Sequence, residues 1–369
     1  MKEVPGAQDE PQSPTSLRSV RVLLVDPPAF TPPYDDALAS ALARAGAEVE
    51  LVTSRFRFGP APVPDGYRRR ELFYPLSSRL FRRSPLRLPL KAAEHAAGLV
   101  RLRGLAADVV HVQWAPLPQL DLRLLPFQRP SVVTAHDVLP RRTASKRDLW
   151  RRLYGRFDGI VVHSERGRDR LVSEVGVEAA RIRVIPHPVF PGTPRYDGDG
   201  RTLLFLGVIR PYKQLDHAVS LARELGARLL VVGDPATDVT RWSGGPGIEW
   251  RLGYVPEAEV DRALAEATLA LFPYREEIDQ SGALLRCLGA GVPAVAYDVG
   301  GLGEPLRRFA AGAVVPPDDR GALAAAVQRL LGDPGALETA RAGARRAAAE
   351  LTWDAAAAAH LTLYAEIVR

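Results

Sequence analysis

Arg210 and Lys213 stand three positions apart on a loop that Pro211 stiffens. They follow residues 203–206, an apolar run typical of a buried strand, which ends at Gly207. Because parallel sheets bind ligands beyond the carboxyl ends of their strands, we expect both cations to project into a binding position. Two fixed cations at such a point favour a phosphate ligand, and the alternative is a solvated charged turn.

A second candidate phosphate site lies in the DQSG loop, residues 279–282, which includes Gln280. A predicted helix begins at this loop, so the backbone N–H groups of Ser281 and Gly282 would be free to bind an anion. Glycine at position 282 also lets a ligand approach the backbone closely. Glu304 follows a glycine pair after the next predicted strand and supplies a carboxylate suited to a hydroxyl group or a ribose. Together these groups match the needs of a nucleoside diphosphate.

Polar residues also follow two successive strand-like runs in the first half of the chain. Residues 131–134 precede His136 and Asp137, and residues 159–162 precede His163. The strand ends of a parallel sheet converge on one rim, which favours a substrate pocket there. We expect His136 and Asp137 to serve catalysis, whereas a structural role is the commoner one for a residue such as His163.

Strand-like runs alternate with helical spacing along the whole chain, which predicts an α/β protein with parallel sheets. A length of 369 residues suits two Rossmann-like, doubly wound domains of ordinary size. The expected strands are residues 21–26, 48–53, 108–113, 131–134 and 159–162 in the first domain and 203–206, 227–232, 248–252, 269–272, 294–297 and 312–315 in the second.

Changes of composition predict the domain boundaries. Residues 1–18 are rich in Pro, Ser and Gln and have no apolar core, so we expect a disordered leader rather than a signal peptide. The first domain is expected to cover residues 19–188, a Pro- and Gly-rich linker residues 189–200, and the second domain residues 201–351. The Ala-rich segment 353–369 predicts a terminal helix.

Composition also excludes several classes of protein. Apolar residues make up 46% of the chain, and no apolar run reaches the ~18 residues of a membrane span. Cys287 is the single cysteine, which excludes a disulfide or a thiolate metal site within the chain. No Gly-x-Gly-x-x-Gly motif follows the first strand, which argues against an NAD or FAD enzyme. We therefore expect a cytoplasmic protein without redox chemistry.

The segment of residues 65–103, here called the basic segment, carries ten basic and three acidic residues, a formal charge of +7. Apolar residues are interleaved with these charges. The pattern predicts either a solvated Arg-rich face or contact with an anionic membrane surface or an acidic acceptor. Nucleic-acid binding is disfavoured because no zinc-finger, helix-turn-helix or RNP pattern accompanies the charge.

Seven motifs occur in the same order as in a known family. They are VVTAHD with His136, GVIRPYK with Arg210 and Lys213, LLVVGD with Gly233, GYVP with Val255, the DQSG loop, GVPAVAYDVGGLGE, and LTWDAAAAAHLTLY near the C-terminus. Over almost all of the chain after the leader, the sequence therefore resembles the family 4 (GT4) retaining glycosyltransferases of the GT-B fold. In that fold two Rossmann-like domains face each other across a cleft.

The resemblance implies transfer of a sugar from a nucleoside diphosphate sugar to an acceptor hydroxyl group, with retention of configuration and without a metal or another cofactor. It implies that Arg210 and Lys213 hold the donor diphosphate and that His136 meets the transferred sugar. The terminal helix would cross back to the first domain. The acceptor stays open between a glycan, a lipid-linked molecule and a small molecule. The donor site would contain Gly207, Arg210, Lys213, Gly233, Val255, Gln280, Ser281, Gly282 and Glu304.

One departure from the family pattern concerns the ribose. The commoner pattern has two glutamates eight positions apart, of which the second contacts the ribose, whereas Ile278 and Arg286 occupy these positions here. The DQSG loop resembles a variant branch with (S/T)QSG, in which Ser and backbone amides keep the phosphate role. Glu304 is the expected substitute, and the ribose end of the site stays open.

The expected chemistry follows from fixed positive charge. Arg210, Lys213 and the helix N–H groups would stabilise the leaving diphosphate most strongly in the transition state. The leaving phosphate would take the proton of the acceptor, with His136 and Asp137 as the alternatives, and closure of the domains about the linker would exclude water. Two rival hypotheses share the fold: a hydrolysing nucleotide-sugar epimerase, and a non-catalytic protein that binds a nucleotide sugar or a membrane surface.

Overall fold

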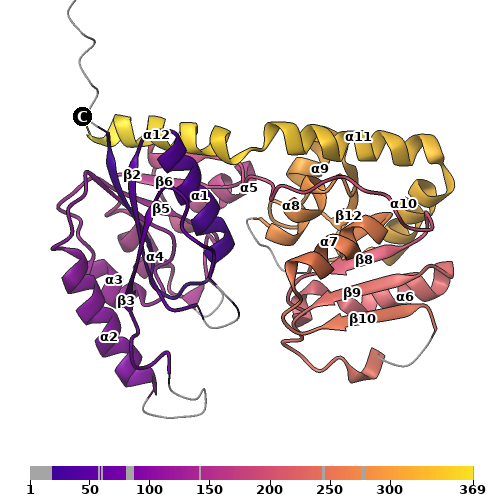
Figure 1. Ribbon diagram of the computed structural model, residues 1–369, viewed down its shortest axis with the longest axis horizontal. Coiled ribbons are helices and arrows are strands. Elements are labelled where there is room, and N and C mark those ends of the chain that lie inside the picture. Colours follow the sequence, from indigo (N-terminus) through magenta and orange to yellow (C-terminus); the bar gives the residue numbers. More distant parts are fainter. Residues whose placement is uncertain are drawn as a thin grey trace, which may run out of the picture.

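The computed structural model describes residues 19–56, 59, 61–79, 87–140, 143–242, 246–275 and 280–368. These residues form two parallel β-sheets, one of seven strands and one of six. Figure 1 shows the sheets in two separate domains, each surrounded by helices, with two long helices running along one side of both. The prediction of an α/β protein with two Rossmann-like domains is therefore confirmed.

The order of the strands in the first sheet reverses next to β1, near the centre of the sheet. β1 pairs with β2 on one side and with β4 on the other, and the full order is β3-β2-β1-β4-β5-β6-β7. Ligands of such sheets bind beyond the strand ends at this reversal. The strands are β1 (Arg21–Asp26), β2 (Glu48–Ser54), β3 (Arg68–Phe73), β4 (Val109–Val112), β5 (Ser131–Thr134), β6 (Gly159–Val162) and β7 (Ile182–Val184).

The sheet of the second domain follows the same plan, in the order β10-β9-β8-β11-β12-β13. All residues of β8, β11 and β12 are buried, as expected for parallel strands that helices cover on both faces. The strands are β8 (Leu203–Leu206), β9 (Leu229–Gly233), β10 (Ile248–Leu252), β11 (Leu269–Phe272), β12 (Ala294–Tyr297) and β13 (Gly312–Val315).

Neighbouring residues of β1 point to opposite faces of the first sheet. Leu23 and Val25 pack into a core with residues of α2, α3 and α4, whereas Val22 and Leu24 pack into a core with α1 and the C-terminal helix α12. Both faces of the sheet are thus covered. The helices of this layer structure are α1 (Pro32–Arg44), α2 (Arg87–Leu102), α3 (Pro118–Leu124), α4 (Arg147–Tyr154), α5 (Glu165–Arg170) and α12 (Trp353–Val368).

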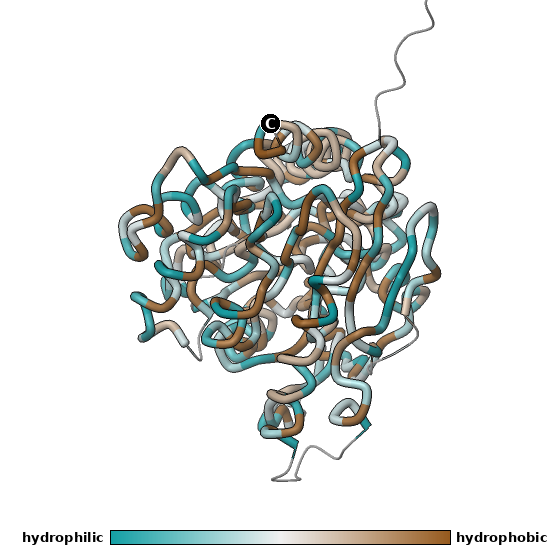
Figure 2. Tube along the Cα trace, turned by 90° about the vertical axis from the view of Figure 1, so that its left-hand side faces the viewer, coloured by the Kyte–Doolittle hydropathy of each residue, from teal (hydrophilic) through white to brown (hydrophobic). Residues whose placement is uncertain are grey.

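One continuous core fills the second domain on both faces of its sheet. Figure 2 shows the corresponding pattern for the described residues, with many hydrophobic stretches inside the molecule and many hydrophilic ones at its periphery. None of the helices in the described part of the chain is both long and apolar enough to cross a membrane. The helices of the second domain are α6 (Leu215–Leu225), α7 (Glu257–Glu266), α8 (Gly282–Gly289), α9 (Gly303–Phe309), α10 (Arg320–Gly332) and α11 (Pro334–Glu350).

The sequence patterns missed two edge strands, β3 and β7. β3 lies within the basic segment, and its three consecutive arginines do not suggest a strand. At the edge of the sheet these side chains are accommodated because Arg68 pairs with Glu48 at 3.1 Å and Arg70 pairs with Glu50, both across the β2–β3 pairing. β7 has only three residues, too few for a periodic pattern.

The last two helices connect the domains. α11 packs through residues such as Ala344 on the core of the second domain, and α12 packs on α1 of the first. The rings of Tyr34 and Trp353 lie 5.2 Å apart between centroids, and the Tyr364 hydroxyl bonds with Nδ1 of His111 on β4 at 2.7 Å. Figure 1 shows this pair of helices, in yellow, crossing from the second domain to the first.

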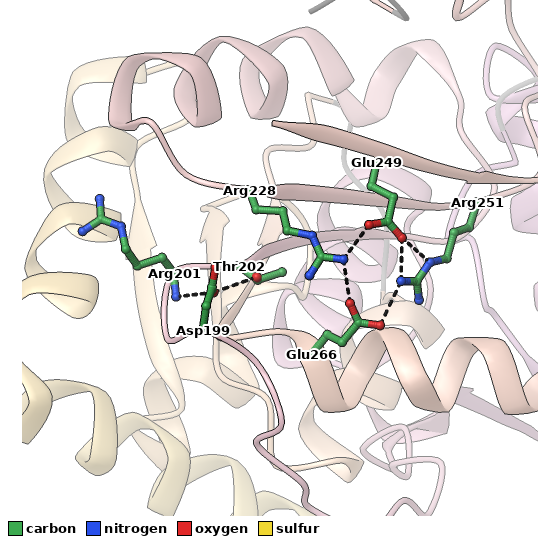
Figure 3. A network of polar contacts seen from close by, with 7 residues as sticks. All are labelled: Asp199, Arg201, Thr202, Arg228, Glu249, Arg251 and Glu266. Atoms are coloured by element: carbon green, nitrogen blue, oxygen red, sulfur yellow. Dashed lines mark hydrogen bonds and ion pairs between the residues drawn. The ribbon is translucent and has the colours of Figure 1, made fainter. Parts of the chain in front are cut away.

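A network of four charges fastens α7 to the edge of the second sheet. Arg228, just before β9, and Arg251, on β10, each pair with Glu249 and with Glu266, the last residue of α7. Figure 3 shows each carboxylate lying between the two guanidinium groups. Because every charge has two partners of opposite sign, the network holds the C-terminal end of α7 more firmly than one exposed pair would.

Removal of the Tyr364 hydroxyl tests how α12 is attached to the first domain. His111 is fully buried, and its other nitrogen bonds with Oγ1 of Thr134 at 2.8 Å. Tyr364→Phe leaves Nδ1 of His111 without a partner, so we expect the free energy of unfolding, measured by urea denaturation, to fall by about 1–3 kcal/mol. The control Glu366→Gln removes an exposed ion pair with Arg183 and should cost less than about 1 kcal/mol. Equal losses in the two variants would contradict the expectation.

Candidate functional site

The loop after β8 presents its two cations differently. Arg210 is exposed, whereas Lys213, at the end of a short 3-10 turn, is only 7% exposed. Nζ of Lys213 lies over the ring of Tyr274, 5.1 Å from its centroid. Because Tyr274 follows β11 by two positions, the lysine reaches from one strand end to the next. A buried ammonium group against an aromatic face is held in one place.

Gly207 brings this lysine to the start of α8. A β-carbon added to Gly207 would lie 3.1 Å from Nζ of Lys213 and 3.4 Å from Cβ of Ala283, the second residue of α8. Gly207 also has a φ of +101°, which a side chain would strain. The ammonium group, the glycine and the first turn of α8 therefore meet at one point.

α8 begins at Gly282 and is capped by Ser281, whose Oγ accepts a hydrogen bond from the N–H of Leu284 at 3.4 Å. The N–H groups of Gly282 and Ala283 have no partner within the helix, because the donors of a first turn lie ahead of the first carbonyl they could reach. With Lys213 beside them, these donors form an arrangement suited to a phosphate group.

Gln280 ties this loop to the segment that follows β12. Its Nε2 donates to the carbonyl oxygen of Gly301 at 3.2 Å, and its Oε1 accepts from the N–H of Ser281 at 3.1 Å. The amide group is thus used within the protein and orients the loop. Residues 276–279, including Asp279 of the DQSG loop, lie outside the described residues.

The ends of β9 and β10 continue the same edge of the sheet. Gly233 ends β9, and a β-carbon there would lie 2.3 Å from the carbonyl oxygen of Gly207, so only glycine permits this approach. Val255 follows β10 and packs, partly buried, against the core. Gly207, Gly233 and Val255 therefore lie at or just after the ends of three neighbouring strands, β8, β9 and β10 respectively.

Glu304 connects the two domains. Its two carboxylate oxygens accept hydrogen bonds from the N–H groups of Glu165 and Arg166, the first residues of α5, both at 3.0 Å. A carboxylate is favourable there because it satisfies free donors and complements the helix dipole. Oγ of Ser164 accepts from the next donor, Gly167, at 2.9 Å. The carboxylate that we expected to meet a ribose is bound to the first domain in this conformation.

Arg286, which stands where the family pattern has a glutamate, makes ion pairs with α7. Its Nη2 pairs with Oε2 of Glu257 and lies 3.6 Å from Oδ1 of Asp261. Glu257 is the first residue of α7, two positions after Val255. A carboxylate therefore does stand beside position 286, but another helix supplies it.

His136 lies in an aromatic cluster after β5. Its ring stacks on Trp114 at 5.1 Å between centroids and meets Tyr34 edge-on at 4.8 Å, and its Nε2 bonds with Oε1 of Gln113 at 3.0 Å. Burial lowers the pKa of His136 well below its usual value, because the charged ring loses hydration. The neutral ring has Nδ1 left for hydrogen bonding. Asp137, the next residue, is partly buried.

A buried pair of carboxyl groups supports this cluster. Asp26 ends β1 and accepts a hydrogen bond from the N–H of Thr31, in the proline-rich loop after the strand, at 3.2 Å. Burial raises the pKa of Asp26 to about 6 and also raises the pKa of Asp35, whose shift the nearby charge of Asp26 increases. Oγ1 of Thr31 in turn accepts from Nε1 of Trp114 at 3.0 Å. The pair thus fixes the loop that holds the ring beneath His136.

Two aromatic residues of the site were not identified from the sequence. Tyr274, under Lys213, comes just after a buried strand, which is the signal that pointed to His136, and the same rule would have found it. Tyr34 contacts the rings of His136, His163 and His187 at 4.8 to 5.5 Å. It lies inside α1 and has no comparable signal in the sequence.

Metal-binding and thiol groups are not prominent in the described part of the chain. No group of three or more His, Cys, Asp or Glu side chains there is placed to hold a metal ion. Cys287 is buried in α8, where burial raises the pKa of its thiol to about 12. The groups gathered at the start of α8 are therefore a cation and backbone N–H donors.

Curated relatives resemble parts of this chain. An exopolysaccharide phosphotransferase of Streptomyces coelicolor is 34% identical over 53% of this chain, but the match covers only 22% of that protein. A D-inositol 3-phosphate glycosyltransferase of Streptomyces bingchenggensis is 28% identical over 59% of this chain and 54% of its own length. The chain thus spans less than two thirds of the length of these relatives.

Solved structures share the fold along nearly the whole chain. A sucrose-phosphate synthase from Thermosynechococcus elongatus matches with a TM-score of 0.74 at 20% identity, over 94% of this chain and 98% of the other. HepE of Anabaena, solved in complex with UDP-glucose, matches with a TM-score of 0.68 at 14% identity, over 93% and 100% of the two chains. At these identities the similarity shows the GT-B fold.

Two family models match consecutive parts of the chain. Glycosyltransferase Family 4 matches residues 36–191, and glycosyl transferases group 1 matches residues 200–333. The first range contains β2 to β7 and the second contains β8 to β13, and together they cover most of the sequence. The first part of this chain is thus similar to Glycosyltransferase Family 4 and the second part to glycosyl transferases group 1, in a chain with the GT-B fold.

Proposed function

We propose that this protein transfers a sugar from a nucleoside diphosphate sugar to a hydroxyl group of an acceptor. The observation that carries the proposal is the meeting of the Lys213 ammonium group with the first turn of α8 at Gly207. A diphosphate requires this combination of a fixed cation and N–H donors. The structure of HepE with UDP-glucose, similar in fold, supports a nucleotide sugar as the donor.

The same groups would carry the catalysis. The nucleoside diphosphate gains negative charge as the sugar departs, so Arg210, Lys213 and the N–H donors of α8 would stabilise the transition state more than the ground state. Neutralising this charge is the role that a divalent cation has in other transferases. We therefore propose transfer without a metal ion, with Ser281 and Gly282 at the phosphates and Gly233 and Val255 toward the nucleobase.

The first domain would hold the sugar and the acceptor. His136, neutral and fixed by Gln113, has a nitrogen available to a sugar hydroxyl group. We propose that the departing phosphate takes the proton of the acceptor hydroxyl on the face that the leaving group vacates, which would retain the anomeric configuration. Asp137 is the alternative base.

Contact between the domains would exclude water from the reaction. Glu304 binds the start of α5, and Tyr254 of the second domain lies against Gly59 of the first, where an added β-carbon would be 2.4 Å from the Tyr254 ring. Glu304 lies in the first turn of α9, which follows β12, and Tyr254 lies in the loop that follows β10. We propose that Glu304 stabilises the closed arrangement of the two domains. The hydrogen bond from Gln280 to Gly301 would connect the segment that carries Glu304 to the loop at the phosphates.

A cytoplasmic location with peripheral contact to an anionic membrane surface is a further part of the proposal. Within the basic segment, Arg68 and Arg70 form ion pairs with glutamates of β2, so their charge does not support contact with a membrane. The support comes from α2, where Leu88 is 75% exposed, and from the exposed Arg101 and Arg103 at its end.

Loss of the two cations should abolish use of the donor. With UDP-, GDP- and dTDP-sugars as a panel, Arg210→Ala and Lys213→Ala are each expected to lower kcat/KM for release of the nucleoside diphosphate about 10- to 100-fold, because each removes a charged contact to the leaving group. Arg329→Ala, at an exposed position of α10, is the control and should act like the wild type. Undiminished release by the variant that carries both Arg210→Ala and Lys213→Ala would refute the assigned roles. Stable binding of a nucleotide sugar by the wild type without turnover would favour the rival hypothesis of a non-catalytic binding protein.

Removal of the Glu304 carboxylate should loosen the contact between the domains. In Glu304→Ala the N–H groups of Glu165 and Arg166 lose their acceptors, so we expect their hydrogen exchange to accelerate about tenfold or more and donor turnover to fall. The control is Glu350→Gln, which removes only an exposed pair with Arg308. Unchanged exchange at the start of α5 would show that Glu304 does not hold the domains together.

Contact with a membrane can be measured by sedimentation with vesicles. We expect the protein to pellet with phosphatidylserine-rich vesicles at low salt and to be released as salt screens the charges. The double change Arg101→Glu and Arg103→Glu should weaken pelleting several-fold, and Arg329→Glu should not, since about 1 kcal/mol is expected from each cation at the surface. Absence of pelleting at every lipid composition would remove the membrane from the proposal.

A further inference from the structure

The proposed donor site has a phosphate end and a nucleobase end, but no residue is yet assigned to the ribose between them. Glu304 has both carboxylate oxygens on N–H groups of α5. A ribose presents two adjacent hydroxyl groups, and an ionised carboxylate is the side chain best able to accept hydrogen bonds from both. The question is which carboxylate lies between the two ends of the site.

Arg286 stands on α8 four residues after Gly282. Residues four apart lie on the same face of a helix, about 6 Å along its axis. Helical side chains also lean toward the N-terminus, so the guanidinium group extends toward the turn that we assign to the phosphates. Arg286 is therefore one turn or less from the phosphate end of the site.

Glu257 joins this point to the nucleobase end. It begins α7 directly after the loop 253–256, which we assign to the nucleobase, and its Oε2 is bound to Nη2 of Arg286. The ion pair thus bridges the two structural elements given to the base and to the phosphates. In every nucleoside diphosphate the ribose connects these two groups, so the ion pair lies where the ribose has to pass.

The carboxylate of Glu257 is available to a ligand. Its side chain is 69% exposed, while that of Arg286 is 27% exposed. Among the described residues, Oε1 of Glu257 has no partner, and the guanidinium group of Arg286 also lies 3.6 Å from Oδ1 of Asp261, so its charge is shared between two carboxylates. The arginine is thus held between two carboxylates and in turn orients Glu257.

α7 is a fixed support for this side chain. Its last residue, Glu266, lies in the four-charge network with Arg228 and Arg251 shown in Figure 3. Its first residue is bound to Arg286 on α8. A helix of ten residues that is tied at both ends presents Glu257 in one position.

We infer that Glu257, positioned by Arg286, binds the ribose hydroxyl groups of the donor. This inference rests on the proposed function, because it takes the ligand to be a nucleoside diphosphate. It assigns Glu257 to ligand contact and Arg286 to positioning.

The test compares nucleotides with and without ribose hydroxyl groups. Binding of UDP, GDP and ADP to the full chain is measured by calorimetry, and whichever binds is compared with its 2′,3′-dideoxy analogue and with pyrophosphate. We expect the wild type to prefer the ribonucleotide about tenfold or more, and Glu257→Gln to lose most of this preference, while its affinity for pyrophosphate is unchanged. Arg286→Met, which removes the positioning charge, should reduce the preference as well.

The matched control is Glu259→Gln, two positions further along α7, which removes only an exposed pair with Arg262 and should keep the wild-type preference. An unchanged preference in Glu257→Gln would overturn the inference and leave the proposed function intact. Equal weakening of pyrophosphate and nucleotide binding would also overturn it, because Glu257 would then act on the phosphates through Arg286. If the wild type bound none of the nucleotides, the proposed function itself would fail and the inference with it.

Discussion

The site depends on a steric constraint at Gly207. The lysine of the loop after β8 and the first turn of α8 come from parts of the chain about 70 residues apart, and both lie close to position 207, where a β-carbon would crowd the lysine ammonium group. Gly233 repeats the constraint one strand away, where a β-carbon would overlap the carbonyl oxygen of Gly207. The absence of side chains at these two glycines thus lets three strand ends and one helix approach one another. The ammonium group of Lys213 is therefore in position before a ligand binds.

The two domains are related by contacts of very different kinds. α12 is attached to the first domain by apolar packing and by the buried bond between Tyr364 and His111, which are costly to break. Glu304 contacts α5 through a partly exposed carboxylate and two N–H groups, which water can reach. One contact that is costly to break and one that is easily replaced would allow the domain closure that we propose.

Local sequence patterns were sufficient where structure is local. The bounds of β8 and the start of α8 follow from an apolar run and a capping serine, so Lys213, Ser281 and Gly282 could be placed at strand and helix ends in advance. They were insufficient where a contact joins distant segments. Glu304 is 139 residues from Glu165 in the chain, and nothing in either stretch specifies their meeting. β3 was missed for the same reason, since its arginines make sense only beside the glutamates of β2.

At position 286 the residue of the family motif is missing, but the carboxylate that it would supply is present on another helix. An arginine at this position removes the expected carboxylate when the sequence is compared residue by residue. In the folded chain the arginine pairs with Glu257 from α7, so a carboxylate stands beside position 286 with its charge partly balanced. A ligand responds to the position and ionisation of the carboxylate, and the helix from which it comes does not matter to it. The departure from the family pattern is thus compatible with recognition of the same ligand group by a carboxylate from another helix.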